Sequence, residues 1–173
     1  MSQFYSIKAF LLLALCFVSS CGPTPDGKNL IDDINAAKIK ARRFVEEADR
    51  KRNEAREKNQ DEHDRLIEEA AKLYGQASET LAEAAKKAKE LTKVKSPAWY
   101  EEYFDLQSKL INNLAQLAAG AQEELLVRKS GPPSESQLQA WKEHINQIRE
   151  ENEKFRKQIA SIESRQGIVL IKE

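Results

Sequence analysis

The sequence predicts an all-α protein: an antiparallel three-helix bundle or coiled coil whose long N-terminal helix projects as a stalk. Charged residues make up 32% of the 173-residue chain and aromatic residues only 7%, which is typical of long solvated helices. Six glycines and five prolines are few for this length, and most of them lie in short segments that divide the chain. Between these segments, apolar residues recur at spacings of three and four, the period of an α-helix.

Residues 1–20 have the parts of an export signal: Lys8 as the only charge, an apolar core over 9–18 and small residues at the cut. The core is too short to span a bilayer, which needs about 20 apolar residues. The run 18–22, Val-Ser-Ser-Cys-Gly, resembles the lipobox of bacterial lipoproteins, where an aliphatic and two small residues precede a lipid-bearing cysteine. The resemblance implies a lipid anchor on Cys21 in the bacterial cell envelope, at the outer membrane if the source has one. Cleavage by an ordinary signal peptidase is the alternative.

Residues 21–28 are expected to form a short non-helical tether, because they contain two prolines and two glycines. Cys16 lies in the part that cleavage removes, so the mature chain keeps one cysteine and forms no intramolecular disulfide. Loss of Lys8 leaves 27 basic and 28 acidic residues, from 28 of each in the full chain. A formal charge near −1 does not predict a nucleic-acid partner.

The first predicted helix runs from Asn29 to about Val94, a stretch without proline and with one glycine, Gly75. At about 1.5 Å per residue it is roughly 100 Å long. Its apolar residues form one seam over 30–48 and a second seam over 66–91. The chain between the two seams is highly polar, so we expect the helix to lose its apolar face there.

Between the two seams, residues 49–65 contain Ala55 as their only apolar side chain. Their charged residues are spaced for ion pairs between positions i and i+4. The spacing from Ala48 to Ala70 fits two 11-residue repeats, which need no left-handed supercoil. We therefore expect residues 29–62 to stand as a straight solvated stalk.

The second predicted helix begins at Ser96-Pro97, with serine as the cap and proline in the first turn. It ends near Lys129, before Gly131-Pro132-Pro133. Its apolar face is broad, which predicts contact with two neighbouring helices.

The third predicted helix begins at Ser134, because Ser134 and Gln137 have the spacing of a capping box, and it ends near Gly167. Asn152 falls on its apolar seam. An asparagine at such a position commonly sets the register of a coiled coil, so a homo-oligomer with Asn152 as its register residue is one hypothesis. The seam consists of Leu138, Trp141, Ile145, Ile148, Asn152, Phe155, Ile159 and Ile162.

The lengths of the helices predict how they assemble. The second and third helices match only the second half of the first, so residues 63–166 are expected to form an up-down-up three-helix bundle about 50 Å long. In this register Gly75 would face residues 118–120. The alternative layout breaks the first helix near residues 59–61 and folds its first half back to make a four-helix bundle.

The tail at 167–173 contains a run of four large apolar residues, Ile168, Val169, Leu170 and Ile171. Such a run either packs back across the end of the bundle or adds to a partner chain. These four residues are therefore the candidates for partner binding.

The chain offers little chemistry for catalysis. His63 and His144 would lie roughly 13 Å apart by helical rise, too far to share one metal ion, and no metal-ligand or nucleophile motif occurs. We expect no enzyme activity, metal or cofactor. The basic stretch 38–58 is interpreted as a solvated helix face, with contact to an anionic surface as the alternative.

Two functions follow from these patterns. The first is a non-enzymatic, lipid-anchored scaffold that binds an envelope protein or a second copy of itself, with the membrane as partner through Cys21. The second is an amphipathic helical protein that binds a membrane surface or an apolar ligand.

Overall fold

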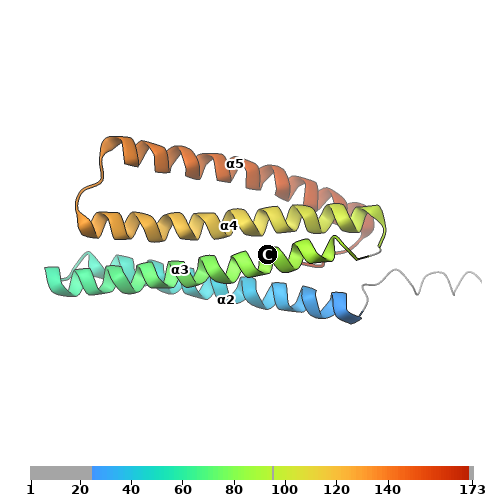
Figure 1. The fold of residues 1–173 in the computed structure, drawn as a ribbon, viewed down its shortest axis with the longest axis horizontal. Helices are drawn as coiled ribbons and strands as arrows, with labels where there is room; N and C mark the ends of the chain where they lie inside the picture. Colours follow the sequence, from blue (N-terminus) through green and yellow to red (C-terminus); the bar gives the residue numbers. More distant parts are fainter. Residues whose placement is uncertain (1–24, 95, 172–173) are drawn as a thin grey trace, which may run out of the picture.

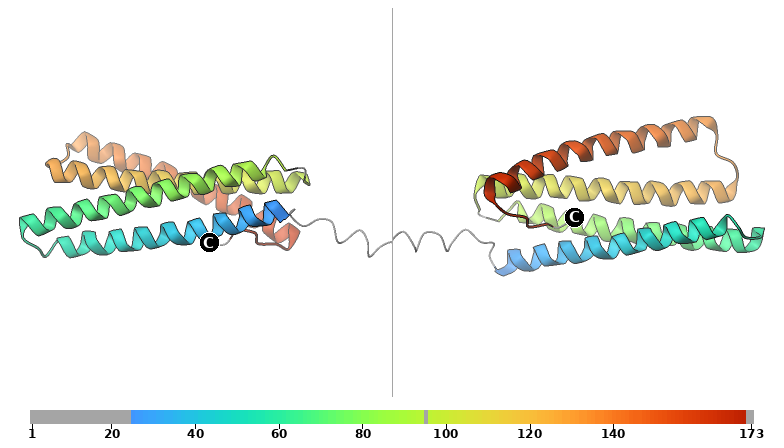
Figure 2. Two further views of the ribbon diagram at one scale, coloured as in Figure 1. Left: turned by 60° about the horizontal axis from the view of Figure 1, so that its bottom comes forward. Right: turned by 180° about the vertical axis from the view of Figure 1, so that it is seen from behind.

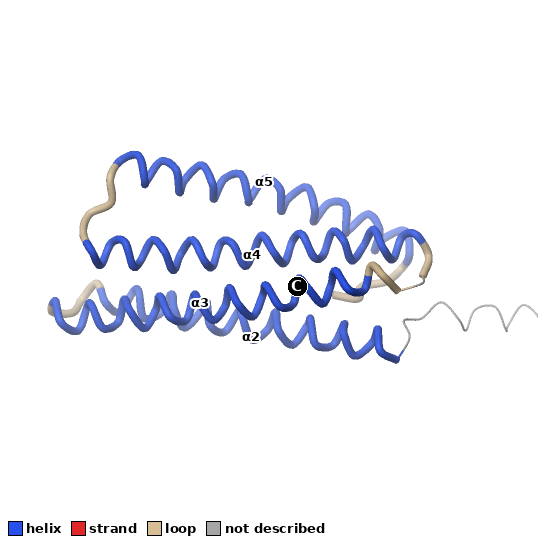
Figure 3. Tube along the Cα trace, viewed as in Figure 1, coloured by secondary structure: helices blue, strands red, loops and turns tan. Residues whose placement is uncertain are grey.

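The computed structural model describes residues 25–94 and 96–171. Within them lie four helices: α2 (Pro25–Ala55), α3 (Gln60–Leu91), α4 (Ala98–Ser130) and α5 (Glu135–Gln166). Consecutive helices run antiparallel, and each packs on the next along the chain (Figure 1). The all-α class is confirmed for this part of the chain, which consists of helices and short loops (Figure 3).

Residues 29–62 do not project as the expected stalk. The helix α2 lies along α3 for most of its length, as two further views show (Figure 2). Ion pairs join the two helices near both ends: Lys51 Nζ lies 2.5 Å from Glu69 Oε2, and Lys87 Nζ lies 2.6 Å from Asp33 Oδ2. The first predicted helix is therefore two helices that form a hairpin.

The hairpin turn occupies residues 56–59, beside the break that the alternative layout placed near 59–61. The backbone N–H of Lys58 donates to the carbonyl of Ala55 at 3.2 Å, which tightens the end of α2. The side chain of Asn59 then caps α3 by accepting from the N–H of Glu62 at 3.1 Å. Since the turn at 56–59 has no apolar side chain, breaking the helix here exposes no apolar surface to water.

A seven-residue repeat of apolar residues, most of them alanine, explains why α2 folds back. Every member is at most 1% exposed, and alanine lets two helix backbones approach closely. Burial of this surface on both helices outweighs the loss of one continuous helix. The repeat comprises Ile34, Ala41, Ala48 and Ala55 on α2, and Ala70, Ala77, Ala84 and Leu91 on α3.

The N-terminal boundary of α2 also differs from expectation. The helix begins at Pro25, so residues 25–28 of the predicted tether are helical. Proline suits the first turn, where its missing N–H would have no partner in the helix. The predicted signal at 1–20, the rest of the tether and Cys21 lie outside the described residues.

The start of α4 differs in one detail from the prediction. Pro97, not Ser96, is the N-cap residue, and the hydroxyl of Ser96 donates instead to the carbonyl of Val94 at 2.9 Å. The register between α3 and α4 is also shifted, because Gly75 faces the side chain of Gln122 and not residues 118–120. The long side chain of Gln122 therefore covers Gly75, in place of the small residues that the sequence predicted there.

Both ends of α5 are where the sequence placed them. Ser134 and Gln137 form the capping box, with each side chain bonded to the other's backbone N–H. Gly167 ends the helix in the left-handed conformation, with φ of 65°, which glycine adopts without steric cost.

The buried residues form two clusters along the helices. The larger joins α2, α3, α4, the C-terminal half of α5 and Ile171, and the smaller joins the hairpin end of α2 and α3 to Leu125 of α4. All residues of the two clusters lie within residues 25–171. The fragment 22–173 therefore contains the whole described core, and it is the protein used in the solution experiments below.

The helix α5 packs well only over its C-terminal part. Ile148, Asn152, Ile159 and Ile162 are buried, whereas Leu138 near its start is 40% exposed. In Figure 1 α5 accordingly diverges from α4 toward the loop at 131–134. Within the described chain, only part of the predicted apolar seam of α5 is buried against other helices.

Candidate functional site

A groove lies between α2 and α5, with α4 and α3 at its base. Its volume is about 690 Å³, within the range of about 300–1,000 Å³ that small-molecule sites occupy. It lies where α2 and α5, the outer helices of the antiparallel series, make few contacts with each other in the described part of the chain. The base is largely apolar, so the groove can hold an apolar group out of water.

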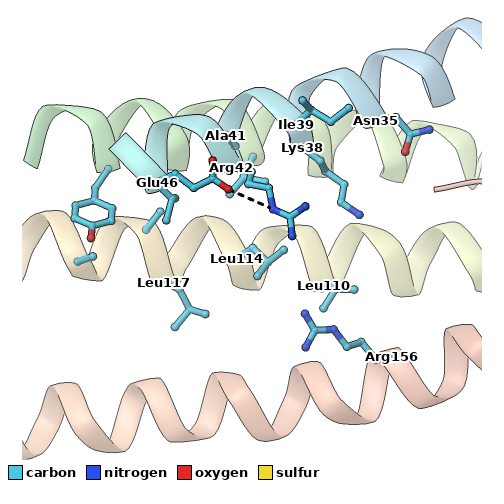
Figure 4. A pocket seen from close by; sticks show the side chains of 15 residues that line it. Asn35, Lys38, Ile39, Ala41, Arg42, Glu46, Leu110, Leu114, Leu117 and Arg156 are labelled. Carbon is cyan, nitrogen blue, oxygen red and sulfur yellow. Dashed lines mark ion pairs between the residues drawn. The ribbon is translucent and has the colours of Figure 1, made fainter. Parts of the chain in front are cut away.

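Side chains from all four helices line the groove (Figure 4). From α2 come Asn35, Lys38, Ile39, Ala41, Arg42, Val45 and Glu46; from α3 Tyr74 and Leu81; from α4 Leu110, Leu114, Leu117, Ala118 and Ala121; and from α5 Arg156. Ile39, one of the lining residues, is 57% exposed. Its neighbourhood is where an apolar ligand would gain most by covering surface.

Each of the two outer helices carries an arginine that lines the groove, Arg42 on α2 and Arg156 on α5. In Figure 4 Arg42 extends from α2 toward α4, and Arg156 extends from α5 into the same space. Closing α2 onto α5 would bring these like charges together in a region of reduced dielectric constant. Arg42 Nε lies 3.9 Å from Glu46 Oε1 on the same helix, and Arg156 Nη1 lies 4.0 Å from Glu153 Oε1 on its own helix.

A buried tyrosine on α3 lies at one end of the groove. The hydroxyl of Tyr74 donates to Asp49 Oδ1 at 2.5 Å, which fixes the ring against α2. Burial, together with this bond to a carboxylate, raises the pKa of Tyr74 to about 12. Tyr74 therefore lines the groove as an uncharged, fixed side chain.

The C-terminal tail crosses the other end of the helices. Ile171 is 2% exposed, and its N–H donates to the hydroxyl of Tyr103 at 3.0 Å. The carbonyl of Leu170 accepts from Asn35 Nδ2 at 3.2 Å, so the tail links α5 to α2. Val169 stays 63% exposed. The tail thus packs on its own helices, and partner binding by residues 168–171 stays a prediction.

Tyr103 is the centre of the polar network under the tail. Its hydroxyl donates to Glu163 Oε1 at 3.0 Å and accepts from the N–H of Ile171 and from Gln107 Nε2. Burial raises the pKa of Tyr103 to about 12, and the carboxylate of Glu163 acts in the same direction. These hydrogen bonds add to the apolar contacts of Ile159 and Ile162, which bury the same part of α5.

Asn152, the predicted register residue, is 4% exposed within the described chain. Its Oδ1 has no hydrogen-bond partner in the described residues. By contrast, Asn113 on α4 donates from Nδ2 to Glu151 Oε2 on α5 at 3.1 Å. A register role in self-association stays a prediction.

Neither histidine takes part in a candidate site. His63 Nδ1 lies 3.1 Å from Asp64 Oδ1 near the surface, and His144 is exposed. Among the described residues, no group of three or more histidine, cysteine or acidic side chains could hold a metal ion. In the same part of the chain, no helix has both the length and the hydropathy that a membrane span requires.

No family model matches the chain, and comparisons with curated proteins and with solved structures find no match either. Sequence reasoning noted the basic stretch 38–58 and the broad apolar face of α4, but it did not bring them together. Arg156 had no signal of its own, because its role depends on where α5 lies relative to α2.

Proposed function

We propose that this protein is a non-enzymatic binding module of the bacterial cell envelope that holds the apolar chain of a small amphiphile in the groove. One observation carries the proposal: a groove of about 690 Å³ has an apolar base in a chain whose surface is otherwise highly charged. Unfilled apolar surface of this kind commonly marks a binding site.

A small chain-like ligand suits the groove better than a protein helix does. An α-helix with its side chains is about 10–12 Å wide, and fitting one would require α5 to move away from α4. The hydrogen bonds of Tyr103 and Asn113 to α5 oppose such a movement. An acyl chain can lie along Leu110, Leu114 and Leu117 without disturbing these bonds.

The groove can be tested with Nile red, a neutral dye whose fluorescence rises in apolar surroundings. We expect saturable binding with one dye per chain and competition by dodecanol. The variant Leu114→Glu places a carboxylate on the half-buried base and should weaken binding by about ten-fold or more. Fluorescence titration measures both affinities.

The matched control is Leu126→Glu, the same change at a 43% exposed position of α4 outside the groove. It should leave dye binding unchanged. If Leu114→Glu loses helicity, Leu117→Trp replaces it, because the larger ring fills the groove and should displace the dye. Equal binding by the wild type and by a folded groove variant would refute the proposal.

The same proposal places the module at a membrane through lipid on Cys21. Only three residues separate Cys21 from Pro25, the first residue of α2, so the start of α2 would lie close to the bilayer. The end of the helices that carries Tyr103 and the tail would then face the membrane, and the groove would begin near it. This arrangement would bring the groove within reach of single-chain lipids.

Lipidation can be tested by growing bacterial cells that express the full chain with an alkyne-bearing fatty acid. We expect the labelled acyl group on the wild type and its complete loss in Cys21→Ser. The control is Cys16→Ser, which should keep the label because residue 16 lies in the predicted signal. Label on Cys21→Ser, or none on the wild type, would argue against the anchor.

A further inference from the structure

The apolar base of the groove has a limited length. The base on α4 is a line of apolar side chains at spacings of four, three and four residues, which keeps them on one face of the helix: Leu110, Leu114, Leu117 and Ala121. At about 1.5 Å per residue this line is roughly 16 Å long. The lining residues of α2 extend from Asn35 to Glu46, an equal stretch of helix. An apolar chain in the groove therefore has a path of defined extent.

Charged side chains lie beyond the Ala121 end of this line. The next position in the same spacing on α4 is Glu124, whose side chain is 33% exposed. On α2, Asp49 Oδ1 accepts from the hydroxyl of Tyr74 and lies 3.2 Å from Arg52 Nη2. Besides burial and the bond to Asp49, the charges of Arg52 and Glu124 act on the pKa of Tyr74, so both lie near its hydroxyl. The apolar surface thus ends at charges that α2 and α4 both supply.

The Leu110 end of the groove lies toward the C-terminal tail. Figure 4 shows Asn35 on the side of Leu110 and Glu46 on the side of Leu117. Asn35 lines the groove and donates from Nδ2 to the carbonyl of Leu170 at 3.2 Å. Polar groups therefore bound the apolar base at both ends. The proposed function places this end nearer the membrane, so an amphiphile would keep its head here and extend its chain toward the charged end.

We propose that the groove selects its ligand by chain length, and that the charges of Asp49, Arg52 and Glu124 set the upper limit. This inference rests on the proposed function and adds the length of chain that the groove accepts. A carbon–carbon bond of about 1.5 Å at a tetrahedral angle advances an extended chain by about 1.3 Å, so roughly 16 Å holds about 13 carbons. Methylenes over the base leave water, whereas any beyond Ala121 stay in water or cover charged groups.

The test is displacement of Nile red from fragment 22–173 by n-alkyl maltosides with 8, 10, 12, 14 and 16 carbons, each below its micelle concentration. The uncharged head is the same throughout, so only the chain differs. We expect binding to tighten about ten-fold for each pair of carbons up to 12, and by less than about two-fold from 14 to 16. An affinity that rises by an equal factor up to 16 carbons would overturn the length limit and leave the apolar groove standing.

Two variants on α4 should move the limit in opposite directions. Ala121→Glu places a carboxylate in the apolar line and should lower the limit to about eight carbons, the length from Leu110 to Leu117. Glu124→Leu extends the line by about 4.5 Å, so the 16-carbon compound should bind about ten-fold more tightly than it binds the wild type. The 10-carbon compound should bind Glu124→Leu and the wild type equally.

The control is Glu123→Leu, the same change at the adjacent exposed residue, which does not line the groove. It should keep the limit of the wild type. An equal gain for the 16-carbon compound in Glu123→Leu and Glu124→Leu would overturn the proposal, because added apolar surface would then act anywhere on the helix.

The remaining outcomes separate this inference from the proposed function. Circular dichroism identifies the folded variants, and one folded variant of the two is enough for the test. An unchanged limit in folded Ala121→Glu or Glu124→Leu would overturn the role of the charged end while the groove remains a binding site. If no maltoside displaces the dye, or the dye itself does not bind, the proposed function fails as well.

Discussion

Replacing Phe104 by alanine is expected to lower the free energy of unfolding by about 3–5 kcal/mol. The ring is 0% exposed and lies in the larger core cluster. It contacts the rings of Tyr100 and Tyr103, with centroids 4.6 and 5.1 Å away. Removing it leaves a cavity and loses two aromatic contacts near the point where α4, α5 and the tail meet.

Urea unfolding of fragment 22–173, followed by circular dichroism, measures this loss. Because a domain of this size is stable by only about 5–15 kcal/mol, the variant should be partly unfolded at moderate urea or temperature. Phe44→Ala is the matched control, since it removes the same atoms from a half-buried position on α2. Its loss should be clearly smaller. Equal losses would mean that the aromatic cluster is not the centre of the core.

The second large effect is a loss of stability at alkaline pH. The ordinary pKa of tyrosine is about 10, whereas that of Tyr103 is raised to about 12 in the folded protein. Between these values the unfolded chain loses the phenol proton and the folded chain keeps it. Stability therefore falls as pH rises, by about 2–3 kcal/mol for Tyr103. Tyr74, also raised to about 12, adds a smaller loss because its hydroxyl lies nearer to water.

The contribution of Tyr103 can be isolated with Tyr103→Phe. Below about pH 9 the variant should be less stable than the wild type, because Glu163, Gln107 and the N–H of Ile171 lose their partner. As pH rises toward about 12 the wild type should lose more stability, and the difference should shrink or reverse. Lysine and arginine titration is common to both proteins and cancels. Curves that stay parallel would contradict the raised pKa.

Local signals in the sequence located most helix boundaries. Ser134 with Gln137, and Gly167 beyond the last apolar position, define α5 through hydrogen bonds between residues close in sequence. The sequence indicates the turn at 56–59 only as an alternative, because its main signal, Asn59, is a cap of common type. A stronger signal was present: two complete seven-residue repeats that end at Ala55 and begin at Ala70, each of which needs a partner helix.

The sequence could not choose between a stalk and a hairpin. A helix with small apolar residues on one face and charges elsewhere is stable alone in water if long enough, and also when packed. What decides is the fit between two surfaces: Ala41 of α2 shares one core cluster with Ala77 of α3, and Ala48 of α2 shares the other with Ala70 of α3. Such a fit depends on contacts between residues distant in sequence, and a single sequence without relatives does not report them.

By itself, the sequence determined the helical class, the caps that begin and end α5, and the apolar stripes, since all of these depend on residues a few positions apart. Only the tertiary structure decided that α2 folds back on α3, that the tail packs under Tyr103, and that Arg42 faces Arg156 across an apolar groove. The physical reason is that a groove forms where two helices fail to meet. Its position follows from the packing of all the other helices and has no residue pattern of its own.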